Sequence, residues 1–300
     1  LPIFPEFELA ITIDRPELYY DFLQKDWTRF CHDYWKNNFL EHHTLSKKRV
    51  TRIYIGNQFC HNLFPRKELL FQVLEKALEN NLAVTLAFSY IRNHLLEEID
   101  ELLQELEVWC QSREKEAGKD QEEIIVNDWA MPILLQGKPH LKPVLGVLLN
   151  KRRKDVRLPY KQGIGNHVDS LAENNLNCGF YQDYLKNTFD IQRFEFESCG
   201  YKVTIPDGHH SLHLPFFQTN TSQYCTLYAV CRYGDRGKQK LPENCPKYCE
   251  QKVFLYPKHL KMVGRYNSLF GYDEKILWDE KQLQDYLEQG IDRIVVNVSL

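Results

Sequence analysis

The sequence predicts an α/β fold, a TIM-like (β/α)8 barrel with an irregular cysteine-rich insertion near the C-terminal half. Short apolar runs rich in β-branched residues recur along the 300-residue chain, as is typical of strands buried on both faces. Amphipathic helical patterns separate several of these runs. The runs number eight, which is the strand number of a closed parallel barrel.

The eight runs are expected to be the barrel strands, because each is short, apolar and bounded by polar or turn-forming residues. They are Leu9–Ile13, Val50–Ile55, Ala83–Phe88, Ile124–Val126, Val144–Leu149, Phe194–Phe196, Leu212–Phe217 and Ile294–Val298.

Helical patterns lie between them. Residues 16–39 follow Asp14-Arg15-Pro16, a helix start signal, and carry aromatic side chains at spacings of three and four. Comparable stripes predict helices over 66–80, 93–115 and 280–289. Residues 154–177 are polar and less regular, and residues 250–272 suggest small extra strands. One domain over 1–300 is expected, with a cysteine-rich insertion at 225–272.

Composition excludes few functions. The net charge of −3 gives no general reason to expect nucleic-acid binding. No apolar run approaches the ~20 residues that span a bilayer. Leu1-Pro2-Ile3 does not begin a signal peptide of the basic-then-apolar kind, and the count of nine cysteines is odd. We therefore expect a cytoplasmic protein with reduced thiols.

Polar residues follow, or stand at, the ends of the predicted strands. In a barrel of this type these ends share one mouth, where the active site is built. We select Asn127, Asp128, Asn150 and Glu197 as substrate-binding candidates. The same mouth is expected to receive Asp14, Asn57, Ser89, Gln218 and Asn297. The alternative is that polar residues end strands in any fold, without a function.

Four cysteines with the spacing C-x5-C-x13-C-x3-C indicate a metal or cluster site. They are Cys225, Cys231, Cys245 and Cys249. Thiolates suit an iron–sulfur cluster or zinc. Buried structural thiols and disulfides are the alternatives. From local spacing alone these four cysteines are the preferred ligand set, because ligands close in sequence cost less loop-closure entropy.

A histidine cluster and a basic run each allow a functional and a structural interpretation. His209, His210 and His213 could add nitrogen ligands, but we interpret Asp-Gly-His-His-Ser at 207–211 as a polar turn entering the seventh strand. The basic run Lys151-Arg152-Arg153-Lys154 follows the fifth strand and could neutralise the phosphates of RNA or the acidic groups of a small molecule. A solvated loop is the alternative reading of that run.

Three segments together resemble the peptidase U32 family. Residues 52–60 form an apolar strand that runs into Gly56 and Cys60. Residues 212–225 resemble the late strand of the family followed by Ser-x-x-Cys, and Cys245-x3-Cys249 precedes a further apolar run. The pattern is most similar to the iron–sulfur members that serve oxygen-independent ubiquinone hydroxylation.

That resemblance implies a [4Fe–4S] cluster held by Cys60, Cys225, Cys245 and Cys249, with Cys231 as bystander or substitute, and zinc as the alternative metal. We favour Cys60 because a barrel brings the ends of strands two and seven to one mouth. The implied activity is oxygen-independent hydroxylation, or a related modification, of a small molecule or RNA. A second U32-family chain is the implied partner. A non-catalytic scaffold with a structural metal is the alternative.

Proteolysis is not expected despite the family's name. The sequence contains no Gly-x-Ser-x-Gly and no His-Glu-x-x-His motif.

Overall fold

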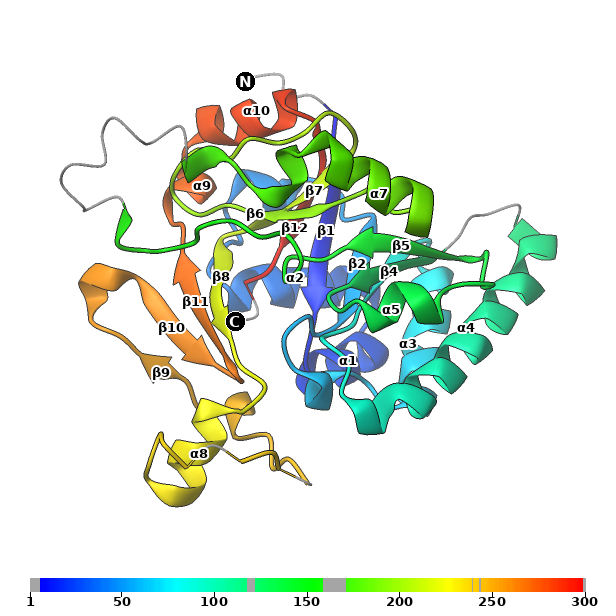
Figure 1. Ribbon diagram of the computed structural model, residues 1–300, viewed down its shortest axis with the longest axis horizontal. Helices are drawn as coiled ribbons and strands as arrows, with labels where there is room; N and C mark the ends of the chain where they lie inside the picture. The colour runs from blue at the N-terminus through cyan, green and yellow to red at the C-terminus, as the bar shows by residue number, and fades with distance from the viewer. Residues whose placement is uncertain (1–5, 118–121, 159–170, 239, 243, 299–300) are drawn as a thin grey trace.

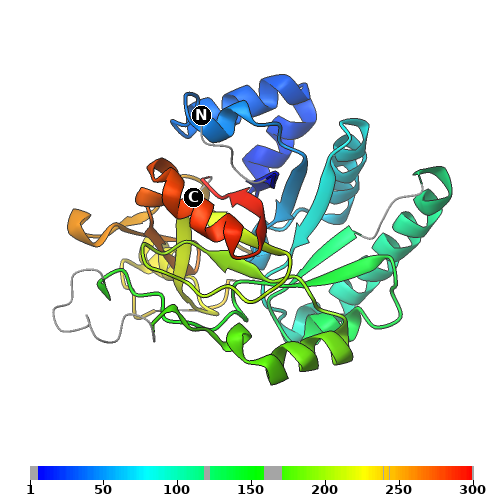
Figure 2. The ribbon, with the colours of Figure 1, turned by 90° about the horizontal axis from the view of Figure 1, so that it is seen from above.

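A computed structural model describes residues 6–117, 122–158, 171–238, 240–242 and 244–298. Eight parallel strands form its central sheet, and helices lie around them (Figures 1 and 2). The strands are β1 (Glu8–Ile13), β2 (Arg52–Gly56), β3 (Ala83–Ala87), β4 (Glu122–Val126), β5 (Leu141–Leu145), β6 (Glu195–Glu197), β7 (His210–Leu214) and β12 (Ile291–Val296).

The sheet is a nearly closed barrel. Its order is β5-β4-β3-β2-β1-β12-β7-β6, so each strand lies beside its neighbours in the sequence once β8–β11 are set aside. The two edge strands approach each other through a parallel bridge between Leu145 and Phe194, and Leu145 N donates to Arg193 O at 3.0 Å. The predicted TIM-like barrel is therefore confirmed.

The helices cover the outer face of the barrel, where their apolar sides pack on the strands in the main hydrophobic core. They are α1 (Pro16–Gln24), α2 (Trp27–Asn37), α3 (Lys67–Glu79), α4 (Leu96–Ala117), α5 (Ala130–Leu134), α7 (Gly179–Phe189), α9 (Lys275–Trp278) and α10 (Glu280–Glu288). A further helix, α8 (Thr226–Tyr233), lies in the cysteine-rich segment and packs in a separate cluster with Tyr266 and Phe270. Short 3-10 turns are η1 (Thr44–Lys47), η2 (His61–Leu63), η3 (Asn93–Leu95), η6 (Asn175–Asn177), η7 (Tyr248–Glu250) and η8 (Lys258–Leu260).

Several predicted boundaries were wrong. The helix predicted over 16–39 is two helices, because Asp26 caps the second by accepting from Arg29 N at 2.9 Å. The fifth strand begins at Leu141 and ends at Leu145, earlier than predicted. The seventh strand begins at His210, so this histidine lies within β7 rather than in the turn predicted before it, and the strand ends at Leu214, earlier than predicted. Part of the polar segment 154–177 lies outside the described residues.

A smaller antiparallel sheet lies beside the barrel (Figure 1). Its order is β8-β11-β10-β9, and its strands are β8 (Phe216–Thr221), β9 (Phe254–Leu255), β10 (Met262–Arg265) and β11 (Ser268–Tyr272). The small strands expected in 250–272 are therefore present. The chain enters this sheet directly after β7 and leaves it for α9, so the cysteine-rich segment is attached at the carboxyl end of a barrel strand.

The inside of the barrel holds a charged network at the amino ends of the strands. Arg293 donates to both carboxylate oxygens of Glu123, at 2.6 and 3.0 Å, and to Glu8 at 2.6 Å. Arg52 donates to Glu8 at 2.9 Å. Above this network Tyr54 packs with apolar side chains from five other strands. Side-chain alternation explains the pattern, since Glu123 and Ile125 point inward while Glu122 and Ile124 point toward the helices.

All nine cysteines are free thiols, which removes the disulfide alternative. Among the described residues, no helix has the length and apolar character needed to cross a bilayer.

Candidate metal centre and barrel-mouth cavity

The turn after β2 brings Cys60 to the barrel mouth. The side-chain oxygen of Asn57 accepts from Phe59 N and Cys60 N, both at 2.9 Å, and so fixes this turn. Gly56 precedes it with φ +105°, and a Cβ at this position would lie 2.6 Å from Ala87 O. The glycine therefore lets β2 and β3 approach closely while the chain turns away from the sheet.

Hydrogen bonds from the β3 loop tie the second sheet to the same mouth. Arg92 donates to Gln223 O at 2.7 Å, and Tyr90 OH donates to Ser222 O at 3.2 Å. Asn267 also donates to Ser222 O, at 2.6 Å. These bonds hold the segment just before Cys225 beside the turn that carries Cys60, which explains how residues far apart in sequence meet.

Four cysteines line one cavity between the barrel and the second sheet. They are Cys60, Cys225, Cys245 and Cys249. Cys225 is the N-cap of α8, where its sulfur accepts from Tyr228 N at 3.3 Å and donates to Tyr266 O at 3.0 Å. Cys231 lies on α8 and packs in the adjacent apolar cluster, but it does not line this cavity. The structure thus brings together the set that includes Cys60.

Burial and the neighbouring thiols disfavour the thiolate form of Cys60, Cys225 and Cys249. Burial raises the pKa of Cys60 to about 12, with smaller contributions from Cys225 and Cys245. Burial also raises the pKa of Cys249 to about 12, and the other three cysteines add to this shift. Burial likewise raises the pKa of Cys225, with smaller contributions from Cys245 and Cys231. Such thiols stay neutral unless a cation replaces their protons.

The four cysteines line the cavity without converging on one point. In the described parts of the chain, no three His, Cys, Asp or Glu side chains are gathered closely enough to hold a metal ion. The walls of the cavity are partly apolar, with Leu227, Pro242 and Tyr266 among them, and Arg92 is the cation beside Cys60.

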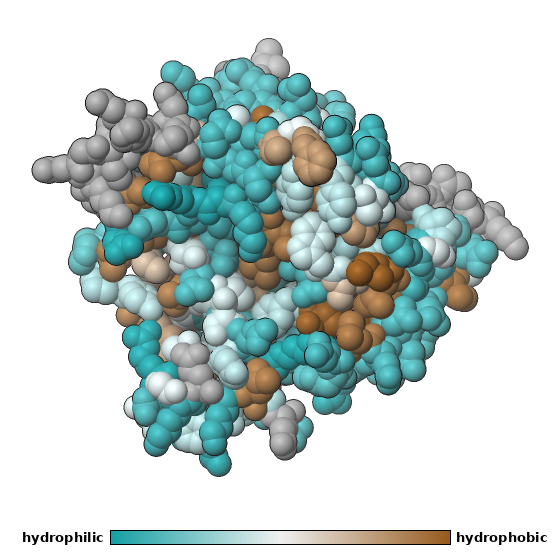
Figure 3. Space-filling model, viewed as in Figure 1, coloured by the Kyte–Doolittle hydropathy of each residue, from teal (hydrophilic) through white to brown (hydrophobic). Residues whose placement is uncertain are grey.

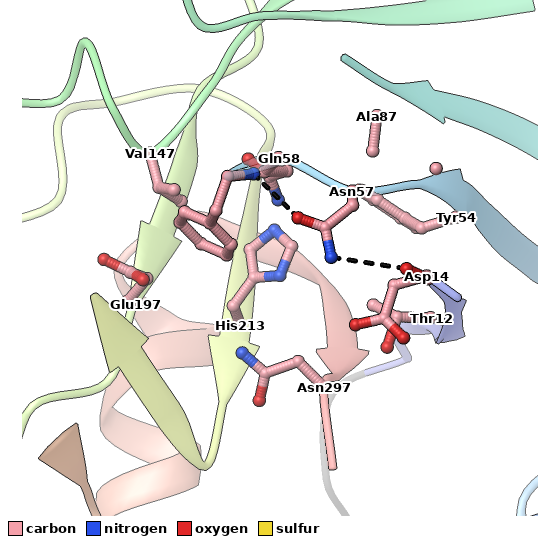
Figure 4. A pocket seen from close by; sticks show the side chains of 12 residues that line it. Thr12, Asp14, Tyr54, Asn57, Gln58, Ala87, Val147, Glu197, His213 and Asn297 are labelled. Carbon is pink, nitrogen blue, oxygen red and sulfur yellow. Dashed lines mark hydrogen bonds between the residues drawn. The ribbon is translucent and has the colours of Figure 1, made fainter. Parts of the chain in front are cut away.

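A second cavity lies at the barrel mouth itself (Figure 4). It has a volume of about 30 Å³, enough for a water-sized group. Its polar lining includes Thr12, Asp14, Asn57, Glu197, His213 and Asn297, which come from five barrel strands or the turns that follow them. The predicted convergence of strand ends is therefore real for Asp14, Asn57, Glu197 and Asn297.

Asn127 and Asp128 have mainly structural contacts. Asn127 donates to Phe88 O at 2.8 Å and to Gln58 Oε1 at 3.2 Å, and it accepts from Leu148 N at 3.0 Å. It thereby joins three neighbouring strand ends. Asp128 accepts from Ala130 N at 2.7 Å at the start of α5. Both residues line a cleft of about 470 Å³ beside the small cavity.

Asn150 lines the same cleft, and its Oδ1 is buried without a partner among the described residues. Its Nδ2 donates to Glu195 O at 3.0 Å. Glu197 faces the small cavity instead, and is fixed by Gln218 N at 2.7 Å and Lys154 Nζ at 2.5 Å. The four predicted residues therefore divide between two adjoining spaces, with Val147 in the wall of both.

The basic run is not a uniform patch. Lys154 is paired with Glu197, and burial lowers the pKa of this lysine despite the neighbouring carboxylate. Arg152 donates to Glu197 O. Only Lys151 and Arg153 of the run are exposed.

Sequence reasoning missed the pairing of His213 with Glu195. His213 Nε2 is hydrogen-bonded to Glu195 Oε2 inside the barrel. A signal was present in the sequence. Charged residues at alternate positions of an otherwise apolar strand, as in Glu195-Phe196-Glu197, indicate a polar barrel interior.

Apolar side chains gather over α5 on the face shown in Figure 3. Trp129 and Ile133 are 41% and 58% exposed, and on α7 Phe180 is 81% exposed. Large apolar side chains exposed close together are typical of surfaces that contact another molecule.

No protein-family model matches the chain, and neither curated protein sequences nor solved structures yield a match.

Proposed function

We propose that the protein is an iron–sulfur protein of the U32 type, which takes part in oxygen-independent hydroxylation or a related modification of a small molecule. The observation that carries the proposal is the single cavity lined by Cys60, Cys225, Cys245 and Cys249. The resemblance of residues 52–60 and 212–225 to the family adds to it.

The donor set fits a [4Fe–4S] cluster. Four thiolates hold such a cluster through separate iron atoms, so the ligands enclose a volume. A single zinc ion holds its sulfurs at about 2.3 Å, and the four sulfurs would have to move together to reach one ion. When bound, the cluster would supply electron transfer. Arg92 would offset part of the negative charge of its ligands, because this residue already lowers the pKa of Cys60.

The substrate site would be the barrel mouth, with the 470 Å³ cleft holding the body of a small molecule. This volume is within the usual range of ligand pockets. Asn150 has the free amide oxygen there, while Asp128 contributes a carboxylate and Lys151 an exposed cation. Asn127 would act by holding the strand ends in place, since both of its amide hydrogens are already donated.

The experiment is anaerobic purification followed by metal, sulfide and absorbance analysis. We expect a brown protein that contains iron and labile sulfide in comparable amounts, with thiolate-to-iron charge-transfer absorbance. A colourless protein with stoichiometric zinc would contradict the cluster. It would leave the alternative of a non-catalytic scaffold with a structural zinc site.

A second chain of similar fold is the proposed partner, and the exposed apolar side chains of α5 and α7 support a contact surface for it. RNA is the weaker substrate, because two of the four basic side chains at 151–154 are engaged within the protein.

A further inference from the structure

A buried histidine–carboxylate pair lies at the small barrel-mouth cavity, and the cluster proposal leaves it unused. His213 on β7 lines the cavity, and its Nε2 is hydrogen-bonded to Glu195 on the neighbouring strand β6. The exposed fractions are 2% for His213 and 0% for Glu195. Figure 4 shows the imidazole among the side chains of Asn57, Glu197 and Asn297.

Glu195 is an anion at neutral pH. Burial alone would raise the pKa of this carboxyl, but His213 and Arg293 together lower it below its ordinary value. Tyr54 OH donates to the other carboxylate oxygen at 3.1 Å, and Arg293 donates to Tyr54 OH at 3.2 Å. An anionic carboxylate can only accept hydrogen bonds, so Nε2 of His213 must carry a hydrogen.

The other ring nitrogen of His213, Nδ1, has no comparable hydrogen bond in the described part of the chain. Among the residues that the structure describes, none forms a hydrogen bond with His213 Nδ1. In the neutral imidazole with hydrogen on Nε2, Nδ1 carries a lone pair. A base held by a third group, with its lone pair free at a cavity, is the arrangement of acid–base sites in general.

We propose that His213 is an acid–base residue, positioned by Glu195, that accepts a proton from a hydroxyl group of a small molecule at the barrel mouth. The cavity of about 30 Å³ admits a group of that size and no more. The rest of the molecule would lie in the adjoining cleft, since Val147 lines both spaces. This inference rests on the proposed use of the barrel mouth for a small molecule, but it does not depend on the metal.

The structural alternative is that His213 is only a packed, buried histidine. His210 shows what such a residue looks like on the opposite face of the same strand, where it packs toward the helices. It stacks on Phe194 with ring centroids 4.8 Å apart, its Nδ1 accepts from Phe194 N at 3.3 Å, and it does not line the cavity. His210 is therefore the internal control.

The first measurement is nitrogen NMR of the purified protein labelled with ¹⁵N-histidine, at roughly pH 7.5. His213→Gln assigns the resonances, and Glu195→Gln removes the positioning charge. We expect wild-type His213 to carry hydrogen on Nε2 alone, and the tautomer to become mixed in Glu195→Gln. Hydrogen on Nδ1 in the wild type, alone or together with Nε2, would overturn the proposal.

The second measurement is hydrogen–deuterium exchange at the imidazole Cε1, which needs only water-sized access to the ring. Peptide mass spectrometry then compares His213 with His210 in the wild-type protein. We expect His213 to exchange at least about tenfold faster, because water reaches its cavity whereas His210 exchanges only after local opening. Equal rates, or slower exchange at His213, would show that even a water-sized group does not reach the imidazole and would overturn the proposal. Neither measurement uses iron, so failure of the cluster assignment is seen separately.

Discussion

Two adjacent glutamates on β4 experience opposite environments. Glu122 points toward the helices, where burial raises its pKa to about 7. Glu123 points into the barrel, where Arg293 and Arg52 outweigh the effect of burial and lower its pKa to about 2. Strand alternation alone separates the two carboxyl groups.

We predict that Glu122→Gln stabilises the protein above pH 7. A carboxyl group whose pKa is raised on folding contributes stability below its unfolded pKa, and this stability is lost as the pH rises through the folded value. The glutamine stays neutral, so the variant should gain on the order of 1–3 kcal/mol at pH 8 and about nothing at pH 4. Denaturant unfolding at both pH values measures this. An equal difference at the two pH values would contradict it.

Glu123→Gln provides the opposite case. The stabilisation from a lowered carboxyl pKa is present above the unfolded pKa and is lost as the pH falls through the folded value. Removing this anion leaves Arg293 buried without its bidentate partner, and we expect a loss of about 3–5 kcal/mol near neutral pH. Unfolding midpoints that match wild type near neutral pH would show that the network contributes no stability.

At the scale of elements, the sequence predicted all eight barrel strands, because apolar β-branched runs identify buried strands well. It did not predict the break between α1 and α2, since the aromatic stripe continues across Asp26 and only the capping contact ends it. It placed His213 in the seventh strand but could not identify Glu195 as its partner, because a polar residue within a barrel strand is explained only by partners from other strands. Local spacing did not predict Cys60 as a member of the cysteine set. Only the family resemblance and the shared barrel mouth did so, and the structure places Cys60 in the same cavity as Cys225, Cys245 and Cys249.

Gly146, just after β5, is predicted to be essential for the packing of the strand ends. A Cβ at this position would lie 2.1 Å from Asn127 Oδ1 and 2.6 Å from Ile125 Cγ2. Gly146→Ala should therefore destabilise the protein by about 1–3 kcal/mol, the usual cost of overpacking. Gly179→Ala is the matched control, because nothing lies within 4 Å of its Cβ at the start of α7. It should change stability by at most about 1 kcal/mol, in the favourable direction. Equal losses in thermal or denaturant unfolding would refute this account of the mouth.

At the scale of the whole molecule, the charge distribution argues against RNA binding. The net charge is −3, and Lys154 and Arg152 are bound to Glu197. We predict no measurable RNA binding at low salt, in a fluorescence titration with an unstructured oligonucleotide. Binding whose salt slope falls by about one unit in Lys151→Ala or Arg153→Ala would contradict this and restore RNA as a substrate.

The arrangement of the whole chain also determines which cysteines can meet. Cys60 belongs to the barrel and the other three cavity cysteines follow β8, so the cavity exists only where the two sheets are held together. Hydrogen bonds from Arg92 and Tyr90 maintain that contact. A cluster at this place would therefore link the metal content of the protein to the docking of its second sheet.

The most direct test of the central claim compares Cys60→Ser with Cys231→Ser after anaerobic purification. Both replace one partly buried thiol with a hydroxyl, which is a much poorer ligand for iron. We predict that Cys60→Ser loses most of its iron, sulfide and colour, whereas Cys231→Ser retains them at the wild-type level. A cluster that survives in Cys60→Ser and disappears in Cys231→Ser would contradict the account and assign the site to the local cysteines alone.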